Sequence, residues 1–180
     1  MIHLKNYTDL TAQEHQDLLN IRNLTTIRNA STNIEEIDFT DHIRWIESLK
    51  TCSGKIYYAV FETNTLCGGI HLIQNNDETA TWGIFFDPNT SVWVIASVTL
   101  YFIDRCFNHL GVTTLQSHIR TNNIPAIAFN RQLGFKPFCE SDDFTLMQLD
   151  EMLWSAQKEK KILKNILQYA THYPINLESL

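Results

Sequence analysis

The sequence lacks the residue patterns of several large protein classes. Its four cysteines are scattered without a Cys-x-x-Cys pair, which is typical of reduced thiols rather than of a disulfide framework or a zinc site. They are Cys52, Cys67, Cys106 and Cys139. Positive charge is also scarce, because 14 Lys and Arg stand against 20 Asp and Glu and no basic cluster precedes residue 158. The pattern therefore predicts no metal site and no binding to a nucleic-acid backbone.

Long apolar runs are absent as well. No stretch approaches the length of about 18 apolar residues that a membrane-spanning helix needs. The N-terminal segment MIHLKNYTDL has no apolar core of the signal-peptide type. We therefore expect a cytoplasmic protein without membrane contact. At 180 residues the chain can form one domain that buries roughly 70% of its unfolded surface.

The beginning of the chain predicts a strand and a helix. Ile2 and Leu4 alternate with polar neighbours, as in a short strand with one buried face. Thr11 and Glu14 have the spacing of a capping box, which predicts a helix that begins after Thr11. From Arg22 to Asn33 the pattern is polar, and we expect an irregular segment there.

A second helix and three antiparallel strands are expected next. The helix begins near Asp38 or Thr40. The apolar runs KIYYAVF and LCGGIHLI flank residues 62–65 and predict a hairpin, and the turn residues 75–77 lead into a third strand.

The stretch from Thr79 to Phe135 predicts a strand, helix, strand and helix in succession. TATWGIFF ends at Asp87-Pro88, the following segment has apolar residues at helical spacing, and VTTLQSHI alternates again. The segment NNIPAIAFNRQLGF predicts a short helix that ends at Gly134. A strand, helix and strand in this order form a parallel crossover, whose helix N-terminus is a plausible anion site. The last hairpin is expected from FKPFCE and FTLMQL.

The C-terminal part predicts an amphipathic helix from Asp150 to Tyr169. Its apolar residues recur at helical intervals, the Lys-rich segment 158–161 lies on the opposite side, and Pro174 follows. The helix packs on its own sheet in one interpretation. In the other it forms a dimer contact or a lid over the acceptor site.

The order of these motifs resembles the GCN5-related N-acetyltransferase (GNAT) superfamily. The resemblance rests first on NNIPAIAFNRQLGF, in which Asn123, Ala126, Phe129 and the Gly134-Phe135 pair match the segment that forms the coenzyme A wall. Upstream, the segments IRN, HIRWIESL and LCGGIHLI, together with Arg28, look like two branches of the family. One branch acetylates amino groups on nucleotide-linked sugars, as in the pseudaminic acid pathway, and the other acetylates the N-termini of ribosomal proteins.

This resemblance implies a fold, a domain organisation and a function. The fold is α/β, with a mixed and mainly antiparallel sheet, a V-shaped opening between two central parallel strands, and helices on both faces. Residues 1–149 would form the acetyltransferase domain and residues 150–180 a helical extension packed on it. The implied reaction is direct transfer of an acetyl group from acetyl-CoA to a primary amine, most plausibly on a nucleotide-linked amino sugar. A binding or regulatory protein without catalysis and a protein N-terminal acetyltransferase are the alternatives, and a homodimer is compatible with the pattern.

The resemblance also implies which residues hold acetyl-CoA. The segment of the strand before the long helix would offer a backbone N–H to the developing oxyanion, and the first turns of that helix would bind the pyrophosphate. The residues are Ile84, Phe85 and Phe86 on the strand, Val94, Ile95, Ala96 and Ser97 on the helix, and Asn123, Ala126 and Phe129 on the later helix. Where the family has small residues in the pyrophosphate loop, this chain has Trp93 and Ile95, so the indole must turn outward or fill the volume of the pyrophosphate.

The proton-transfer groups are less well defined by the sequence. Asn130 stands where the family usually has a tyrosine that protonates the departing thiolate, and its amide can only hydrogen-bond the sulfur. His71 is a candidate base and Thr81 stands where a carboxylate would be expected, although a lone His on an apolar strand is often structural. The candidate acceptor-binding residues are Arg22, Arg28, His42 and Trp45, which are suited to a nucleotide diphosphate and to stacking.

Overall fold

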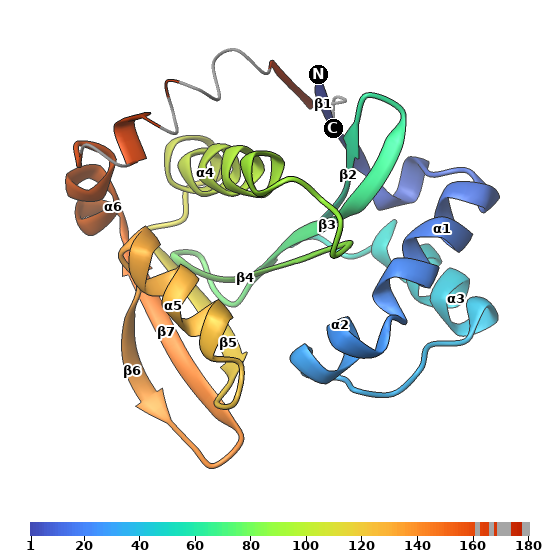
Figure 1. Ribbon diagram of the computed structural model, residues 1–180, viewed down its shortest axis with the longest axis horizontal. Helices are drawn as coiled ribbons and strands as arrows, with labels where there is room; N and C mark the ends of the chain where they lie inside the picture. Colours follow the sequence, from blue (N-terminus) through green and yellow to red (C-terminus); the bar gives the residue numbers. More distant parts are fainter. Residues whose placement is uncertain (161–162, 166–167, 169–173, 178–180) are drawn as a thin grey trace.

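The computed structural model describes residues 1–160, 163–165, 168 and 174–177. Within these residues the chain forms an eight-stranded sheet in the order β6-β7-β5-β4-β3-β2-β1-β8, with helices on both faces (Figure 1). Neighbouring strands are antiparallel except for the pairs β4–β5 and β1–β8, which are parallel. The predicted α/β architecture with a mixed, mainly antiparallel sheet is therefore confirmed.

The elements follow one another as the sequence predicted, with a few additions. The strands are β1 (Ile2–Asn6), β2 (Lys55–Glu62), β3 (Thr65–Gln74), β4 (Thr79–Phe86), β5 (Thr114–Arg120), β6 (Lys136–Glu140), β7 (Phe144–Asp150) and β8 (Ile175–Leu177). The helices are the 3-10 turn η1 (Tyr7–Asp9), α1 (Ala12–Arg22), α2 (Thr25–Ala30), α3 (Phe39–Leu49), α4 (Val92–His109), α5 (Ile124–Leu133) and α6 (Glu151–Lys158).

Local sequence signals explain where several helices begin and end. The Thr11 side chain accepts from the Glu14 N–H while the Glu14 carboxylate accepts from the Thr11 N–H, which is the predicted capping box of α1. Asp38 caps α3 by accepting from the Thr40 N–H. Helix α5 ends at Gly134, whose φ of 101° is readily adopted only by a residue without a β-carbon.

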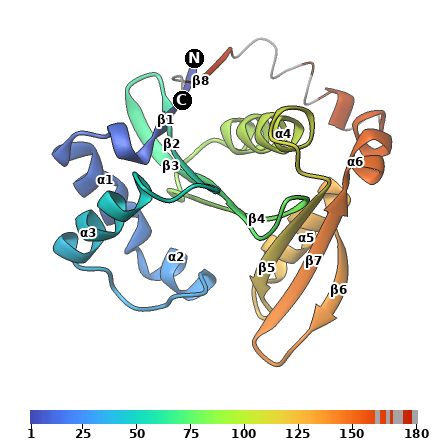
Figure 2. The ribbon, with the colours of Figure 1, turned by 180° about the vertical axis from the view of Figure 1, so that it is seen from behind.

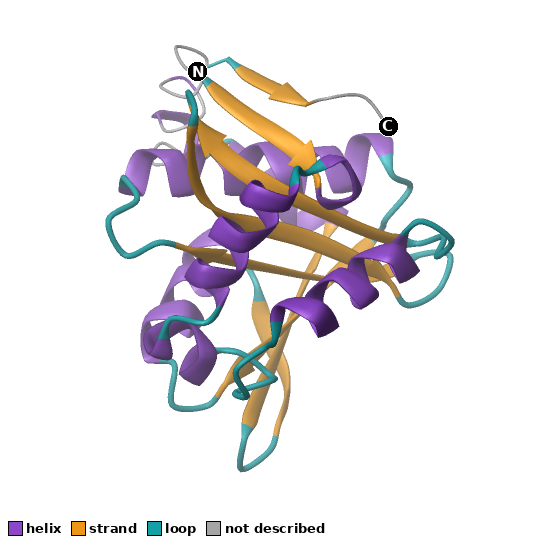
Figure 3. Ribbon diagram, turned by 90° about the vertical axis from the view of Figure 1, so that its right-hand side faces the viewer, coloured by secondary structure: helices purple, strands orange, loops and turns teal. Residues whose placement is uncertain are grey.

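The helices divide into two groups that cover opposite faces of the sheet. Figures 1 and 2 show α1, α2 and α3 on one side and α4, α5 and α6 on the other, and Figure 3 shows the sheet between them. On β2, Tyr58 and Val60 belong to the core cluster under α4, whereas Ala59 and Phe61 belong to the cluster under α1 and α3. Successive side chains of β2 point to opposite faces of the sheet, so this strand contributes to the core on both faces.

The prediction of one helix from Asp150 to Tyr169 is wrong in part. Helix α6 ends at Lys158, where the Lys158 ammonium reaches Asp104 of α4 at 2.6 Å, and residues 159–160 form a turn. Residues 163–165 and 168 are helical again, and the rest of the predicted span lies outside the described residues. Strand β8 pairs in parallel with β1 and is a strand that the sequence did not predict.

The segment from Arg22 to Asn33 also differs from its prediction. It contains the short helix α2, which buries Ile27 and begins without a side-chain cap. Six residues form fewer than two turns, so neither apolar periodicity nor a capping signal could predict this helix.

Candidate active site

Strands β4 and β5 run parallel at the centre of the sheet but stay paired for only part of their length. The paired residues are 79–81 of β4 and 114–116 of β5. Beyond them β4 continues along β3 as far as Phe86, while β5 continues along β7 as far as Arg120. The two halves of the sheet therefore diverge, and the V-shaped opening predicted from the sequence is present (Figure 1).

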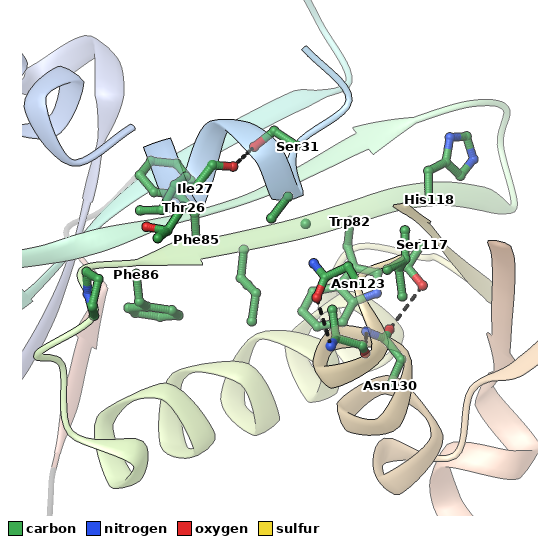
Figure 4. Close-up of a pocket in the computed structure, with 16 residues that line it drawn as sticks. Thr26, Ile27, Ser31, Trp82, Phe85, Phe86, Ser117, His118, Asn123 and Asn130 are labelled. Carbon is green, nitrogen blue, oxygen red and sulfur yellow. Dashed lines mark hydrogen bonds between the residues drawn. The ribbon is translucent and has the colours of Figure 1, made fainter. Parts of the chain in front are cut away.

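A cleft of about 360 Å³ occupies this opening. Its walls come from α2, β4, β5 and α5, with Pro88 after β4. Figure 4 shows Asn123 and Asn130 at α5, and Ile27 of α2 and Ser31 directly after α2 across from them. Because α2 covers one face of the sheet and α5 the other, the cleft can receive groups from both faces.

Two hydrogen bonds establish which peptide groups of β4 face β3. The Asp87 N–H donates to Cys67 O at 2.7 Å, and the Asn75 N–H donates to Thr79 O at 2.8 Å. In an antiparallel ladder the bonded pairs recur every second residue, so the odd-numbered residues of β4 bond to β3. The peptide groups of the even-numbered residues consequently point toward β5.

This alternation exposes particular peptide groups to the cleft. Ile84 and Phe86 are even-numbered and lie beyond the last pair with β5, so their N–H and C=O groups border the opening. The Phe85 N–H belongs to the ladder with Gly69 of β3. Of the three residues predicted for the oxyanion, Ile84 and Phe86 thus have a suitably directed N–H and Phe85 does not.

The N-terminus of α4 follows β4 after a short loop. The Ser91 side chain accepts from the Trp93 N–H at 3.3 Å, and the Ile95 N–H donates to Ser91 O at 3.1 Å. Val92 and Trp93 expose 72% and 48% of their surface, and neither belongs to the walls of the cleft. The indole is therefore turned toward solvent, and the first-turn amides remain directed out of the helix.

The other residues predicted to hold acetyl-CoA lie in different surroundings. Asn123 and Ala126 line the cleft, and the Asn123 side chain caps α5 by accepting from the Ala126 N–H at 3.2 Å. Four predicted residues of α4 do not line it: Val94 and Ser97 are buried, and Ile95 and Ala96 are partly buried. Phe129 packs against the main core. Any contribution of these α4 residues would come through their backbone.

Asn130 is buried at the edge of the cleft and is held by two hydrogen bonds. The Ser117 hydroxyl of β5 donates to Asn130 Oδ1 at 3.0 Å, and Asn130 Nδ2 donates to Ala126 O at 3.0 Å (Figure 4). Asn130 and Ser117 are only 6% and 4% exposed. The sequence predicted Asn130 for this site but not its partner Ser117.

His71 lies on the opposite face of the sheet, toward α1. Its ring stacks on Tyr57 with centroids 5.0 Å apart and lies over Gly83 of β4. Burial, and secondarily the charge of Arg22, lowers the pKa of His71 to about 4. The imidazole is therefore neutral at pH 7 and able to accept a proton, although His71 does not line the cleft itself.

Arg22 and Arg28 lie together between α1, α2 and the loop before α3. Arg22 Nη2 donates to Asn33 O at 3.1 Å, and Arg28 Nη1 donates weakly to Ile34 O at 3.5 Å and lies 4.0 Å from Glu36. Burial lowers the pKa of Arg22. Of the smaller effects, Tyr7 raises this pKa and Arg28 lowers it. Among the described residues, Arg22 Nη1 and Arg28 Nε are buried without a hydrogen-bond partner. Both guanidinium groups thus retain donor capacity.

The remaining predicted residues are placed in packed surroundings. His42 is buried, its Nε2 lies 3.2 Å from His15 Nδ1, and burial and then His15 lower its pKa to about 4. Trp45 packs edge-on against Tyr57. The Thr81 hydroxyl exchanges hydrogen bonds with the Asn75 amide at the closed end of the V. The structure does not bring these three side chains to the walls of the cleft.

Several residues of the cleft were not predicted. They are Thr26, Ile27 and Ala30 of α2, Ser31 directly after α2, Trp82 and Gly83 of β4, Pro88, and Ser117 and Ile119 of β5. The β5 residues could have been found by counting onward from the crossover, since parallel strands that separate must expose the residues after their last pair. The α2 residues had no such signal. Within the described residues there is no group of His, Cys, Asp and Glu that could hold a metal, and no helix long and apolar enough to cross a membrane.

A chain-like ligand with an anionic end suits this arrangement. Peptide N–H groups border one side of the cleft, a helix N-terminus follows at its end, and the opening joins two faces of the sheet. These features are typical of an α/β transferase that binds a phosphate-bearing cosubstrate between diverging strands.

Comparison with known proteins agrees with this class. A family model described as an acetyltransferase (GNAT) domain matches residues 10–145. The acetyltransferase PseH of Campylobacter jejuni subsp. jejuni (strain 81-176) is 30% identical over 144 residues, which are 80% of this chain and 90% of PseH. The crystal structure of Campylobacter jejuni PseH in complex with acetyl coenzyme A has a TM-score of 0.68 at 26% identity, over 84% of this chain and 99% of that one.

A further solved structure supports the fold alone. FdhC, described as a nucleotide-linked sugar GNAT, has a TM-score of 0.73 at 16% identity, over 94% of this chain and 93% of that one. The chain belongs to the GNAT acetyltransferase family and is an acetyl-CoA-dependent N-acetyltransferase. The resemblance stated from the sequence is thereby confirmed.

Proposed function

We propose that this protein transfers an acetyl group from acetyl-CoA to a primary amine on a nucleotide-linked amino sugar. The observation that carries the proposal is the similarity to PseH, at 30% identity over 80% of this chain, together with a cleft that opens on both faces of the sheet. The upstream segments IRN and HIRWIESL are shared with the branch that acetylates protein N-termini, so they do not distinguish the two acceptors.

The residues present fit the acyl donor. Trp93 does not line the cleft, and the first-turn amides of α4 are the groups that would donate to a diphosphate. The even-numbered peptide groups of β4 can bind a pantetheine chain along the cleft. Acetyl-CoA supplies an activated thioester, and the protein has only to orient it, to accept its carbonyl oxygen, and to admit the amine from the other face.

The Ile84 N–H and the Phe86 N–H are the best placed donors of a hydrogen bond to the acetyl carbonyl oxygen. Both point into the opening, and both belong to a strand that is rigidly paired with β3. A fixed peptide N–H directed at a developing oxyanion contributes more than a mobile side chain, since it needs no reorganisation during the reaction.

The acceptor would approach from the face covered by α1, α2 and α3. Arg22 and Arg28 would bind the diphosphate of the nucleotide sugar, a role supported by their two unpartnered nitrogens. His71 is neutral at pH 7 and is the candidate base for the proton of the attacking amine, directly or through water. Because burial and Arg22 lower its pKa to about 4, it would pass that proton on rather than keep it. His42 and Trp45 would act by supporting this face, since His42 is buried in the α1–α3 contact and Trp45 packs on Tyr57.

An acceptor panel tests the proposal. Purified protein and acetyl-CoA are incubated with a nucleotide-linked amino sugar, a peptide with a free N-terminus, or spermidine, and products are identified by mass spectrometry. We expect one acetyl group on the sugar amine and far slower acetylation of the other two. Preferred acetylation of the peptide, or no consumption of acetyl-CoA with any amine, would contradict the proposal.

The acceptor-binding role of the arginines has its own measurement. Arg22→Gln and Arg28→Gln should each raise the KM for the nucleotide sugar about tenfold and leave the KM for acetyl-CoA nearly unchanged, as expected when one charged hydrogen bond is lost. Arg44→Gln is the matched control, because Arg44 is exposed on α3 and pairs with Asp41 of the same helix. An equal change in both KM values would show a general structural effect instead.

A further inference from the structure

The pair formed by Ser117 and Asn130 is a polar feature of the cleft that the proposed function does not require. Both side chains are almost fully buried, and they come from β5 and α5, on the wall that faces β4. Ser117 follows the last residue of β5 that pairs with β4, so the pair lies near the closed end of the V. Burial of polar side chains costs free energy unless they are hydrogen-bonded, so the hydrogen bonds of this pair have to be accounted for.

Hydrogen-bond accounting determines how the Asn130 amide is oriented. A backbone carbonyl can only accept, so the atom of Asn130 that contacts Ala126 O at 3.0 Å must be the NH2 group. The amide oxygen therefore faces Ser117, whose hydroxyl is the donor of that 3.0 Å bond. Two partners thus determine one orientation, in which Oδ1 is engaged by a serine and Nδ2 by a carbonyl.

This orientation leaves one N–H of Asn130 for a ligand. The NH2 group carries two hydrogens, and only one of them is directed at Ala126 O. Without the Ser117 hydroxyl the amide would lose the hydrogen bond that engages its oxygen and fixes its orientation. Ser31 donates to Ile27 O and Asn123 accepts from the Ala126 N–H. Among the described residues Trp82 Nε1 is a second donor of the lining that has no hydrogen-bond partner.

The location of this N–H indicates which atom of the donor it meets. The Ile84 and Phe86 amides border the cleft from the β4 side, and Asn130 borders it from the opposite side. A thioester carbon that lies between these walls, with its oxygen toward β4, presents its sulfur toward β5 and α5. The sulfur is also where negative charge collects when the carbon–sulfur bond breaks.

We propose that Ser117 is a positioning residue, which orients the Asn130 amide so that its second N–H binds the sulfur of coenzyme A. The inference rests on the proposed use of acetyl-CoA. In the transfer, the amine nitrogen forms a bond to the acetyl carbon, the carbon–sulfur bond breaks, and sulfur departs with the electron pair as a thiolate. The amine proton passes to a base or to water. Asn130 releases no proton and stabilises the thiolate by hydrogen bonding alone.

The test measures the thiol of bound coenzyme A directly. Coenzyme A labelled with ¹³C at the carbon next to sulfur is titrated with base in complex with the protein, and the chemical shift gives the thiol pKa. In the wild type we expect a value below the usual pKa of about 8.5, because the N–H favours the thiolate. Ser117→Ala should raise it by at least about half a unit and Asn130→Leu by about one unit, with kcat about tenfold lower in the latter.

Two further variants make the result specific. Ser117→Thr retains the hydroxyl and should restore the wild-type thiol pKa. Ser31→Ala removes another hydroxyl from the walls of the cleft without touching Asn130, and it should leave the thiol pKa unchanged. Thermal melting of each variant establishes that it is folded.

The outcomes separate this inference from the proposed function. If Ser117→Ala binds coenzyme A with normal affinity and with the same thiol pKa as the wild-type complex, the positioning role is wrong while acetyl transfer stands. If the wild type binds coenzyme A with a lowered thiol pKa but acetylates no nucleotide sugar, the positioning role stands and the proposed acceptor is wrong. If coenzyme A does not bind to the wild type at all, both are overturned.

Discussion

Gly83 of β4 lies directly beneath the imidazole of His71. A β-carbon at this position would be 2.5 Å from His71 Cε1, which is well inside van der Waals contact. We expect Gly83→Ala to lower the free energy of unfolding by about 1–3 kcal/mol, because the ring must leave its stack on Tyr57. Urea unfolding measures the change. In a His71→Ala background the same substitution should cost much less, and an equal cost in both backgrounds would show that the clash is not the cause.

The protonation of His71 depends on Arg22. Burial is the larger cause of the lowered pKa of His71, and the nearby Arg22 charge lowers it further. Arg22→Gln should therefore raise the pKa of His71 from about 4 toward its ordinary value of 6.5, as measured by NMR titration of the histidine side chains. Arg44→Gln should not change it. A pKa of His71 that stays the same or falls in Arg22→Gln would show that the two groups do not interact.

The resemblance to the GNAT family predicted part of the lining of the cleft. Asn123, Ala126 and Asn130 were found because their spacing before Gly134-Phe135 is a local property of one helix, and the structure places all three at the cleft. Ser117 could not be found in this way, because its importance comes from a contact with a residue 13 positions away in another element. His42 was expected at the acceptor site but lies buried in the contact between α1 and α3. The sequence shows that His42 can titrate, but it does not show that the side chain is buried.

At the scale of elements, α1 and α3 are joined through a buried pair of histidines. Burial lowers the pKa of both His15 and His42. The charge of His15 lowers the pKa of His42 further. Glu14 and Glu47 raise the pKa of His15, and Lys50 lowers it. Below pH 6.5 the unfolded chain binds protons that these buried rings do not, so the free energy of unfolding should fall as the pH decreases from 6.5 toward 4. His71 contributes with the same sign.

Substitution of His42 tests this effect. His42→Gln keeps a hydrogen-bonding side chain opposite His15 but cannot titrate, so the fall in stability between pH 6.5 and 4 should become shallower. Chemical denaturation at a series of pH values measures the slope. His109→Gln is the control because His109 is exposed at the end of α4. An unchanged slope in His42→Gln would contradict the assignment.

Arg120 connects α2 to β5 across the cleft. Its Nε donates to Ser31 O at 2.7 Å, its Nη2 donates to Thr32 O at 3.1 Å, and the guanidinium lies 5.1 Å from the Phe144 ring centroid. Arg120→Gln should loosen α2, and we expect amide hydrogen exchange in residues 25–32 to become several-fold faster while exchange in α1 is unchanged. Arg44→Gln should have no such effect. Uniformly faster exchange would indicate global destabilisation rather than release of α2.

Element length decided which parts of the fold could be predicted. Long elements with a clear period, such as α4 and the strands β2, β3 and β4, match their predictions because many residues repeat the same signal. Helix α2 and strand β8 are too short to show a period, and β8 depends on the edge of β1. Helix α6 ends at Lys158, which contacts Asp104, a residue 54 positions earlier. Helical spacing alone carries no information on such a contact and extended the helix too far.

At the scale of the whole molecule, the diverging sheet separates two binding faces and joins them through one cleft. The α4 and α5 face carries the helix N-terminus and the Ser117–Asn130 pair, which Figure 4 shows. The face covered by α1, α2 and α3 carries Arg22, Arg28 and His71. A donor and an acceptor that enter from opposite faces can then meet at β4. The order of elements predicted this arrangement from the sequence, whereas the direction of Trp93 required the structure.

A crystal structure with acetyl-CoA is the most direct test of this account. We predict the diphosphate against the first-turn amides of α4, the acetyl oxygen at the Ile84 or Phe86 N–H, and the sulfur beside Asn130, with the Trp93 indole still turned toward solvent. An indole that occupies the position of the diphosphate, or acetyl-CoA bound outside the opening between β4 and β5, would contradict it.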